Sequence, residues 1–142
     1  MENNAMIKIT TVQQPFDGGA EDRIELETLG KFSKKNDKFY IMYDETELTG
    51  FKNTKTIVKI AEDNITLSRK GDVESKMEFS LGGKRLCNYN TPYGMIPVAT
   101  ELREFKNDLG EDGGKVELSY TIDFNNESYA LNTLHISVRT KG

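Results

Sequence analysis

The sequence is poor in the residue types that build metal, disulfide and redox sites. Its 142 residues include one cysteine, Cys87, one histidine, His135, and no tryptophan. A single cysteine forms no internal disulfide, and a closed zinc site needs four ligands. The alternating pattern places Cys87 and His135 on the outer face, far apart in the chain, so we expect no nucleophilic pair. We therefore expect no cofactor, no metal and a reducing, cytoplasmic location.

The sequence also has no excess of positive charge and no long apolar run. Lysine and arginine number 19 against 23 acidic residues, a net charge of -4. That balance lacks the basic footprint needed to bind a phosphate backbone, which argues against nucleic acid as a partner. The longest apolar stretch, Met95–Ala99, is far too short to span a bilayer. The start, Met1–Ala5, does not resemble a signal peptide, and we expect residues 1–5 to be a disordered lead-in.

Short segments of alternating apolar and polar residues make up most of the chain, and each ends at Gly, Asn or Asp. A period of two without a long helical pattern is typical of antiparallel strands. The candidate strands are residues 6–13, 23–33, 38–45, 54–62, 65–70, 75–81, 84–91, 94–103, 115–124 and 128–139. Tight turns favour neighbouring strands that run up and down, since parallel strands need long crossovers. The sequence therefore predicts one all-β domain over residues 1–142, an antiparallel up-and-down barrel of about eight to ten strands.

Turn sequences predict how these strands pair, and a slip of one residue would move every side chain to the other face. The predicted pairs are Phe32–Ile41 across Asn36-Asp37, Val58–Arg69 across Asp63-Asn64, Arg69–Ser75 across Gly71–Val73, Phe79–Leu86 and Ser75–Asn90 across Gly82-Gly83, and Leu118–Leu134 across Asn125–Glu127. These registers agree on one apolar face, with Leu86 directed inward and Cys87 outward. Residues 100–113 are harder to interpret because Leu102, Phe105 and Leu109 also fit a helical stripe. We expect a strand to residue 103 and then an irregular loop.

Polar residues gather where the strand over 38–45 ends and the strand over 54–62 begins, which must lie at the same rim of a barrel. The inward-facing set at this rim is Tyr43, Glu45, Thr54, Thr56, Arg69, Ser75 and Asn90. Arg69 shares its face with apolar residues, and an unpaired buried charge costs several kcal/mol, so it needs a carboxylate or several acceptors. Glu45 is the expected partner. Tyr120 joins the candidate ligand-binding set, although Tyr43 and Tyr120 are also explained as core residues with hydrogen-bonded hydroxyls.

Three functions are compatible with this rim. In the leading interpretation, a non-enzymatic barrel binds a small amphipathic or anionic molecule, with its headgroup on Arg69 and its tail in a cavity of a few hundred Å³. In the second, the barrel is filled and recruits a protein through a strand edge or an outer face carrying Ile57, Ala61 and Tyr89. In the third, Glu45 is a catalytic base beside Arg69. Alternatively, Arg69 extends to water or makes one structural ion pair.

Six short segments of the chain together carry a resemblance to a known protein family. They are Tyr43–Glu45, Lys55–Ile60, Ile65–Gly71, Met77–Phe79, Thr91–Gly94 and Val116–Tyr120. The Lys-Thr-Ile-Val-Lys run and the Arg-x-Gly turn are the most specific of them. With these segments the sequence resembles the YwiB-like family of small bacterial proteins, over nearly its whole length. The resemblance implies a calycin-type barrel, related in shape to lipocalins and fatty-acid-binding proteins, and carries over no catalytic or binding residue.

Overall fold

Ten antiparallel β-strands make up the described part of the chain. The computed structural model describes residues 4–45, 53–72, 74–91, 94–124 and 127–140. The strands are β1 (Ala5–Pro15), β2 (Asp22–Lys35), β3 (Lys38–Asp44), β4 (Thr54–Ile60), β5 (Asn64–Gly71), β6 (Ser75–Ser80), β7 (Lys84–Thr91), β8 (Gly94–Gly110), β9 (Gly113–Phe124) and β10 (Glu127–Thr140). Each strand pairs with its neighbours in sequence, and β1 also pairs with β10, which closes the barrel. The predicted all-β, up-and-down barrel is confirmed.

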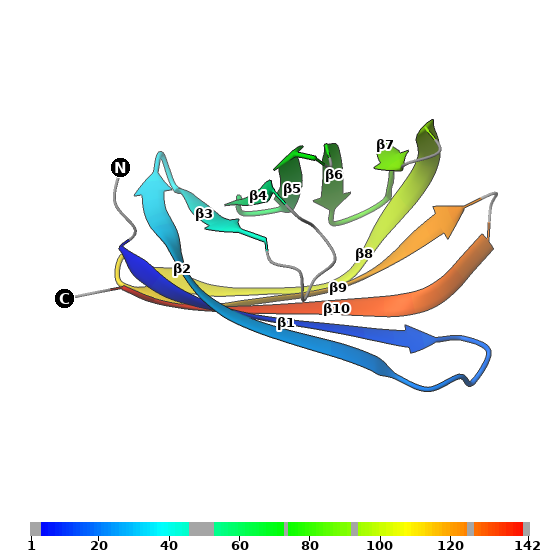
Figure 1. Ribbon diagram of the computed structural model, residues 1–142, viewed down its shortest axis with the longest axis horizontal. Coiled ribbons are helices and arrows are strands. Elements are labelled where there is room, and N and C mark those ends of the chain that lie inside the picture. Colours follow the sequence, from blue (N-terminus) through cyan, green and yellow to red (C-terminus); the bar gives the residue numbers. More distant parts are fainter. Residues whose placement is uncertain (1–3, 46–52, 73, 92–93, 125–126, 141–142) are drawn as a thin grey trace.

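The barrel has a long side and a short side. The long strands β1, β2, β8, β9 and β10 form a broad curved layer, and the shorter strands β3 to β7 cover it (Figure 1). Because the chain runs up and down, β1, β3, β5, β7 and β9 all end at one end of the barrel, where β2, β4, β6, β8 and β10 begin. We call this end the mouth. The predicted rim lies there.

Apolar side chains fill the half of the barrel away from the mouth. The large side chains with almost no exposure are Ile7, Ile41, Ile60, Ile65, Phe79, Leu118 and Ile136. Each such residue contributes about 1.5–3 kcal/mol relative to leaving it in water. The ring of Phe79 also packs against that of Tyr120, with centroids 4.5 Å apart. This packed half forms the floor of any space nearer the mouth.

Three predicted registers are confirmed. Phe32 pairs with Ile41, and the turn residues Asn36 and Asp37 both have positive φ, as the favoured two-residue hairpin turn requires. The other confirmed pairs are Arg69–Ser75 and Leu118–Leu134.

The register predicted between β4 and β5 is wrong by two residues. Val58 lies opposite Leu67, and Arg69 lies opposite Thr56. The two-residue turn is Glu62-Asp63 rather than Asp63-Asn64, since the Ala61 N–H donates to the Asn64 carbonyl at 2.9 Å. A shift of two residues keeps every side chain on its predicted face. It moves Arg69 closer to the mouth, beside a hydroxyl.

The register predicted between β6 and β7 is wrong by one residue, which has larger consequences. Ser75 pairs with Tyr89 rather than with Asn90. Three residues, Leu81–Gly83, connect the strands in place of the expected two. The slip reverses the faces of β7, so Leu86 is 89% exposed and Cys87 is buried. The predictions of an inward Leu86 and an outward Cys87 are therefore both wrong.

The expected irregular loop after residue 103 is also wrong. β8 continues to Gly110 and stays paired with β9. Leu102 pairs with Tyr120 and Glu104 pairs with Ser119, so Arg103 is the extra residue of a β-bulge. The bulge shifts the alternation along β8 by one residue, so that Phe105 rather than Glu104 faces inward. It explains why Leu102 and Phe105, three positions apart as on a helix, both contribute to the core.

The expected disordered lead-in is wrong for its last two residues, while residues 1–3 lie outside the described part. Ala5 begins β1 and is fully buried. The Asn4 side chain donates to the Phe32 carbonyl and accepts from the Phe32 N–H, each at 2.8 Å. Asn4 thereby extends the pairing of β1 by one further residue.

Gly30 marks the point where β2 leaves β1 and joins β3. An added Cβ would meet the Ile7 side chain and the Met42 carbonyl. We expect Gly30→Ala to reduce the free energy of unfolding by about 1–3 kcal/mol through overpacking. The measurement is the midpoint of urea unfolding. Gly83→Ala is the control, because its Cβ would meet open space, and equal midpoints for the two variants would contradict this account.

Candidate ligand site

A cavity of about 380 Å³ lies inside the barrel at the mouth. Its apolar wall is formed by Ile24, Leu67, Met77, Val98 and Ile122, and its polar wall includes Gln13, Arg69, Tyr120 and Asn132. A smaller space of about 130 Å³ adjoins it, sharing Arg69 and Tyr120, and is also lined by Tyr43 and Glu45. Both spaces lie above the packed half of the barrel. The expected cavity of a few hundred Å³ is therefore present.

Four of the predicted residues form one row across the short side of the barrel. Tyr43 on β3 pairs with Thr56 on β4, Thr56 pairs with Arg69 on β5, and Arg69 pairs with Ser75 on β6. Alternation along β5 places Arg69 on the same face as the buried Leu67. The sequence thus brings a tyrosine, two hydroxyls and a guanidinium together through strand pairing alone.

Glu45 pairs with Arg69, as expected. Glu45 follows β3 directly, and its N–H donates to the Thr54 carbonyl at 2.8 Å. The Glu45 side chain is 2% exposed; its Oε1 accepts from Thr56 Oγ1 at 2.5 Å and lies 3.8 Å from Arg69 Nε. The Arg69 side chain retains 16% exposure. The carboxylate is thus enclosed, whereas Arg69 keeps some exposure and lines the cavity.

The buried Tyr43 hydroxyl lies next to this ion pair. Burial raises the pKa of Tyr43 well above its ordinary value, and the Glu45 carboxylate raises it further. The Arg69 guanidinium opposes this shift of the pKa but does not reverse it. Tyr43 is therefore neutral throughout the physiological range and acts as a hydrogen-bonding group rather than as a base.

The remaining predicted residues are spread around the barrel wall. Tyr120 lines the cavity from β9, and Thr54 is buried at the start of β4. Ser75 lines a groove on the outside of the barrel instead of the cavity. Asn90 pairs with Met95 through its backbone, and its side chain lies outside the described part of the structure. Asn90 was placed in the site because it was predicted to pair with Ser75, and that register is wrong.

The sequence reasoning missed the polar groups that β1, β2 and β10 contribute. Gln13, Asp22 and Asn132 line the cavity at the mouth. The register between β1 and β10 joins the two ends of the chain, and no turn sequence specifies it. The sequence offered one weak signal for Gln13: alternation along the strand from Ile7 and Ile9 places it on the inner face.

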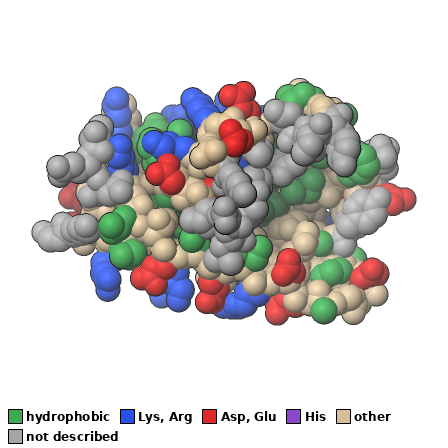
Figure 2. Space-filling view, viewed as in Figure 1, with side chains coloured by type: hydrophobic (Ala, Val, Ile, Leu, Met, Phe, Trp, Pro, Cys, Tyr) green, Lys and Arg blue, Asp and Glu red, His purple; other side chains and the backbone are tan. Residues whose placement is uncertain are grey.

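The other chemically active residues form no further site in the described ranges. There, no three histidine, cysteine, aspartate or glutamate residues lie close enough to hold a metal ion. His135 Nδ1 lies 3.3 Å from Glu117 on the outer face, with both side chains more than two-fifths exposed. Acidic and basic side chains are mixed over the surface, as on the face in Figure 2. No helix in the described residues has the length and apolar character to cross a membrane.

The raised pKa of Tyr43 has a consequence for stability in alkali. The hydroxyl holds its proton more tightly in the folded state, so its contribution is complete below about pH 10, the ordinary tyrosine pKa, and is lost as the pH rises further. We expect Tyr43→Phe to weaken this alkaline loss, measured as urea midpoints between about pH 8 and about pH 11. Parallel pH dependences for the variant and the parent protein would show that Tyr43 does not contribute.

Three comparisons connect the chain to known proteins. The family model described as "Domain of unknown function (DUF1934)" matches residues 7–136. The uncharacterized β-barrel protein YwiB of Bacillus subtilis (strain 168) is 28% identical over 121 residues, which cover 85% of this chain and 84% of that protein. The crystal structure of the ywiB protein from Bacillus subtilis has a TM-score of 0.83 at 22% identity and covers 99% of this chain and 93% of that chain, which supports the fold.

The family resemblance noted in the sequence is confirmed by these matches, whereas a relationship to calycins stays a prediction. The match over residues 7–136 includes β2 to β9, most of β1 and β10, and every residue of the row. The chain belongs to the family of β-barrel proteins described as DUF1934.

Proposed function

We propose that this protein is a non-enzymatic, cytoplasmic barrel that binds a small amphipathic molecule carrying an anionic group. The observation that carries the proposal is the cavity of about 380 Å³ with Arg69 on its wall. Its volume lies within the range of small-molecule sites, about 300–1,000 Å³. A cavity with many apolar side chains and a few polar groups is the usual composition of such a site.

Arg69 supplies the recognition of the anionic group. A guanidinium offers a planar fork of N–H donors that matches a carboxylate or a phosphate. Opposite it, Val98 and Ile122 provide an apolar surface for the tail. In the partly dehydrated cavity, a charge-assisted hydrogen bond is stronger than in water.

Glu45 positions the guanidinium and partly offsets its positive charge. The carboxylate accepts from the Thr56 hydroxyl and lies 3.8 Å from Nε of Arg69. Arg69 also lines the cavity, so its guanidinium is held at the cavity wall. Because Glu45 is enclosed and already accepts from Thr56, it supports a positioning role better than that of a catalytic base.

The second candidate function is a protein-interaction module, and one observation favours it. Leu86 is 89% exposed and Met95 is 61% exposed. A strand-edge interface has little support, because the described strands close into a barrel and only β6 and β7 share as little as one backbone pair. Of the outer-face residues expected to contribute, Ile57 and Ala61 are half-buried, and the Tyr89 side chain lies outside the described part.

Native mass spectrometry of protein purified from its host tests the binding proposal. We expect a reproducible adduct that the denatured protein lacks and that Arg69→Met abolishes, because loss of the fork removes the charge-assisted hydrogen bonds. Arg103→Met is the matched control, since Arg103 is an exposed residue whose Nε lies 3.4 Å from Glu101.

Arg69→Met alone leaves the Glu45 carboxylate buried beside an apolar side chain, which can prevent folding. The double variant Glu45→Gln, Arg69→Met removes both charges and keeps the shape of the row. The same loss of adduct is expected in the double variant. A bare mass for the parent protein, or an adduct retained in the double variant, would overturn the proposal and favour a protein partner.

A further inference from the structure

β6 and β7 are joined by a weak seam in the barrel wall. The described register between them is the single pair Ser75–Tyr89. By contrast, β6 pairs with β5, and β7 pairs with β8, along their whole lengths. Backbone pairing is therefore continuous on both sides of this seam but sparse across it.

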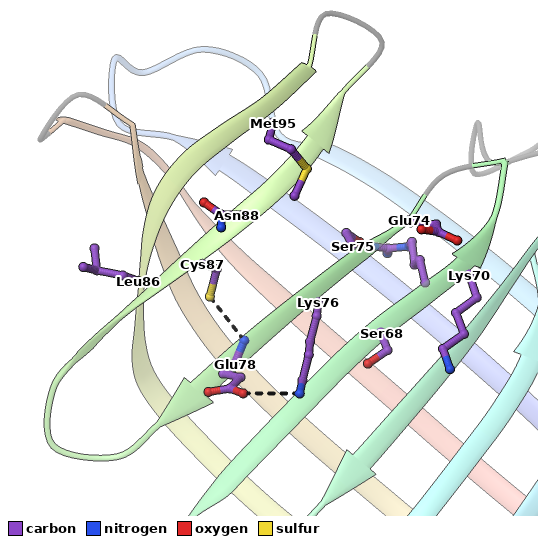
Figure 3. A pocket seen from close by; sticks show the side chains of 11 residues that line it. Ser68, Lys70, Glu74, Ser75, Lys76, Glu78, Leu86, Cys87, Asn88 and Met95 are labelled. Carbon is purple, nitrogen blue, oxygen red and sulfur yellow. Dashed lines mark hydrogen bonds and ion pairs between the residues drawn. The ribbon is translucent and has the colours of Figure 1, made fainter.

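Side chains replace the missing backbone pairing at Glu78. Its N–H donates to Cys87 Sγ at 3.4 Å, and its carbonyl accepts from Thr100 Oγ1 at 2.5 Å (Figure 3 shows the contact with Cys87). Thr100 lies on β8, so this hydrogen bond joins β8 directly to β6, although β7 lies between them in the strand order. A thiol is a weak acceptor, which makes these contacts weaker than a regular ladder.

A groove of about 800 Å³ lies over this seam on the outside of the barrel. Its lining combines residues of both faces of the sheet, among them the buried Cys87 and the exposed Leu86 and Met95. In Figure 3, Leu86 points away from the wall, while Cys87 points toward β6. This mixed lining coincides with the stretch where β6 and β7 share a single described backbone pair.

The groove and the internal cavity meet at Arg69. Arg69 lines the groove, the cavity and the smaller space beside the cavity. Its pair partner Ser75 lines the groove, and the buried Ser75 Oγ has no hydrogen-bond partner in the part of the chain that the structure describes. Arg69 is thus the residue that the groove and the cavity share.

We propose that the β6–β7 seam is the entrance through which the ligand reaches the cavity. This inference rests on the proposed binding function. Leu86 and Met95 offer apolar contact to the arriving molecule, and Arg69 receives its anionic group in the wall. Opening requires separation of two strands that share little backbone pairing, and local openings of this kind need much less free energy than global unfolding.

A disulfide across the seam tests this entrance. Lys76 and Asn88 are the next positions in the register of the pair Ser75–Tyr89, and both are exposed. Directly opposite residues of antiparallel strands lie within disulfide range. In Lys76→Cys with Asn88→Cys in a Cys87→Ser background, oxidation should close the seam, and reductant should reopen it in the same molecule. The probe is anilinonaphthalene sulfonate, an amphipathic anion whose fluorescence rises in apolar sites.

We expect oxidation to slow both association and dissociation of the probe by about tenfold or more, measured by stopped-flow fluorescence. The dissociation constant should stay unchanged, because a barrier on the path alters both rates equally. A matched control is Lys59→Cys with Thr66→Cys in a Cys87→Ser background, which bridges a fully paired seam and should leave both rates unchanged. Ser75→Phe plugs the seam without oxidation and should also slow both rates.

Equal rates for the oxidised and reduced Lys76→Cys, Asn88→Cys variant, with Ser75→Phe also unchanged, would overturn the entrance and leave the mouth as the route. A changed dissociation constant at an unchanged association rate would overturn it too, because that is an effect on the site and not on the path. Failure of the binding function itself looks different: the parent protein then shows neither a mass adduct nor a fluorescence rise.

Discussion

The closure of ten strands into one barrel is the constraint on which the rest of the structure depends. An eight-stranded barrel is just wide enough for side chains to fill its interior, and the diameter grows with the number of strands. With ten strands, the apolar residues of this chain fill the half away from the mouth, and a cavity remains in the other half. The cavity is thus a consequence of strand number, and the chemistry of the site depends on which residues the strands bring to the mouth.

The polar row at the mouth shows how a charge is kept inside such a wall. Arg69 alone would carry the cost of an unpaired buried charge. Strand pairing brings it next to Thr56, which donates to Glu45, and Glu45 in turn lies beside Arg69. The carboxylate is enclosed, but the guanidinium keeps some exposure. In the proposed binding function, this asymmetry makes Arg69 the group that meets the ligand, with Glu45 and Tyr43 holding it in place.

Sequence alone predicted the strands, the up-and-down order and the Glu45–Arg69 pair, because alternation and turn residues are local signals. The Asn36-Asp37 turn has one favoured geometry and gave the correct register. The turn near Asp63 lies one residue earlier than predicted, which shifts the register by two residues and keeps every side chain on its predicted face. Pairing of β1 with β10, and so the contribution of Gln13 and Asn132, connects the chain ends and has no local signal. The bulge at Arg103 concealed a strand because it shifts the period by one residue.

The one register error that mattered lies at the seam proposed as the entrance. Counting from Gly82-Gly83 assumes that β7 follows β6 as a regular hairpin, whereas β7 pairs fully with β8 and scarcely with β6. Cys87 and Thr100 then take over the backbone groups of Glu78. Local rules fail most often where a protein gives up regular pairing for another purpose. Here the failure lies close to Arg69, which lines both the outer groove and the cavity, so the irregular seam and the candidate site share a residue.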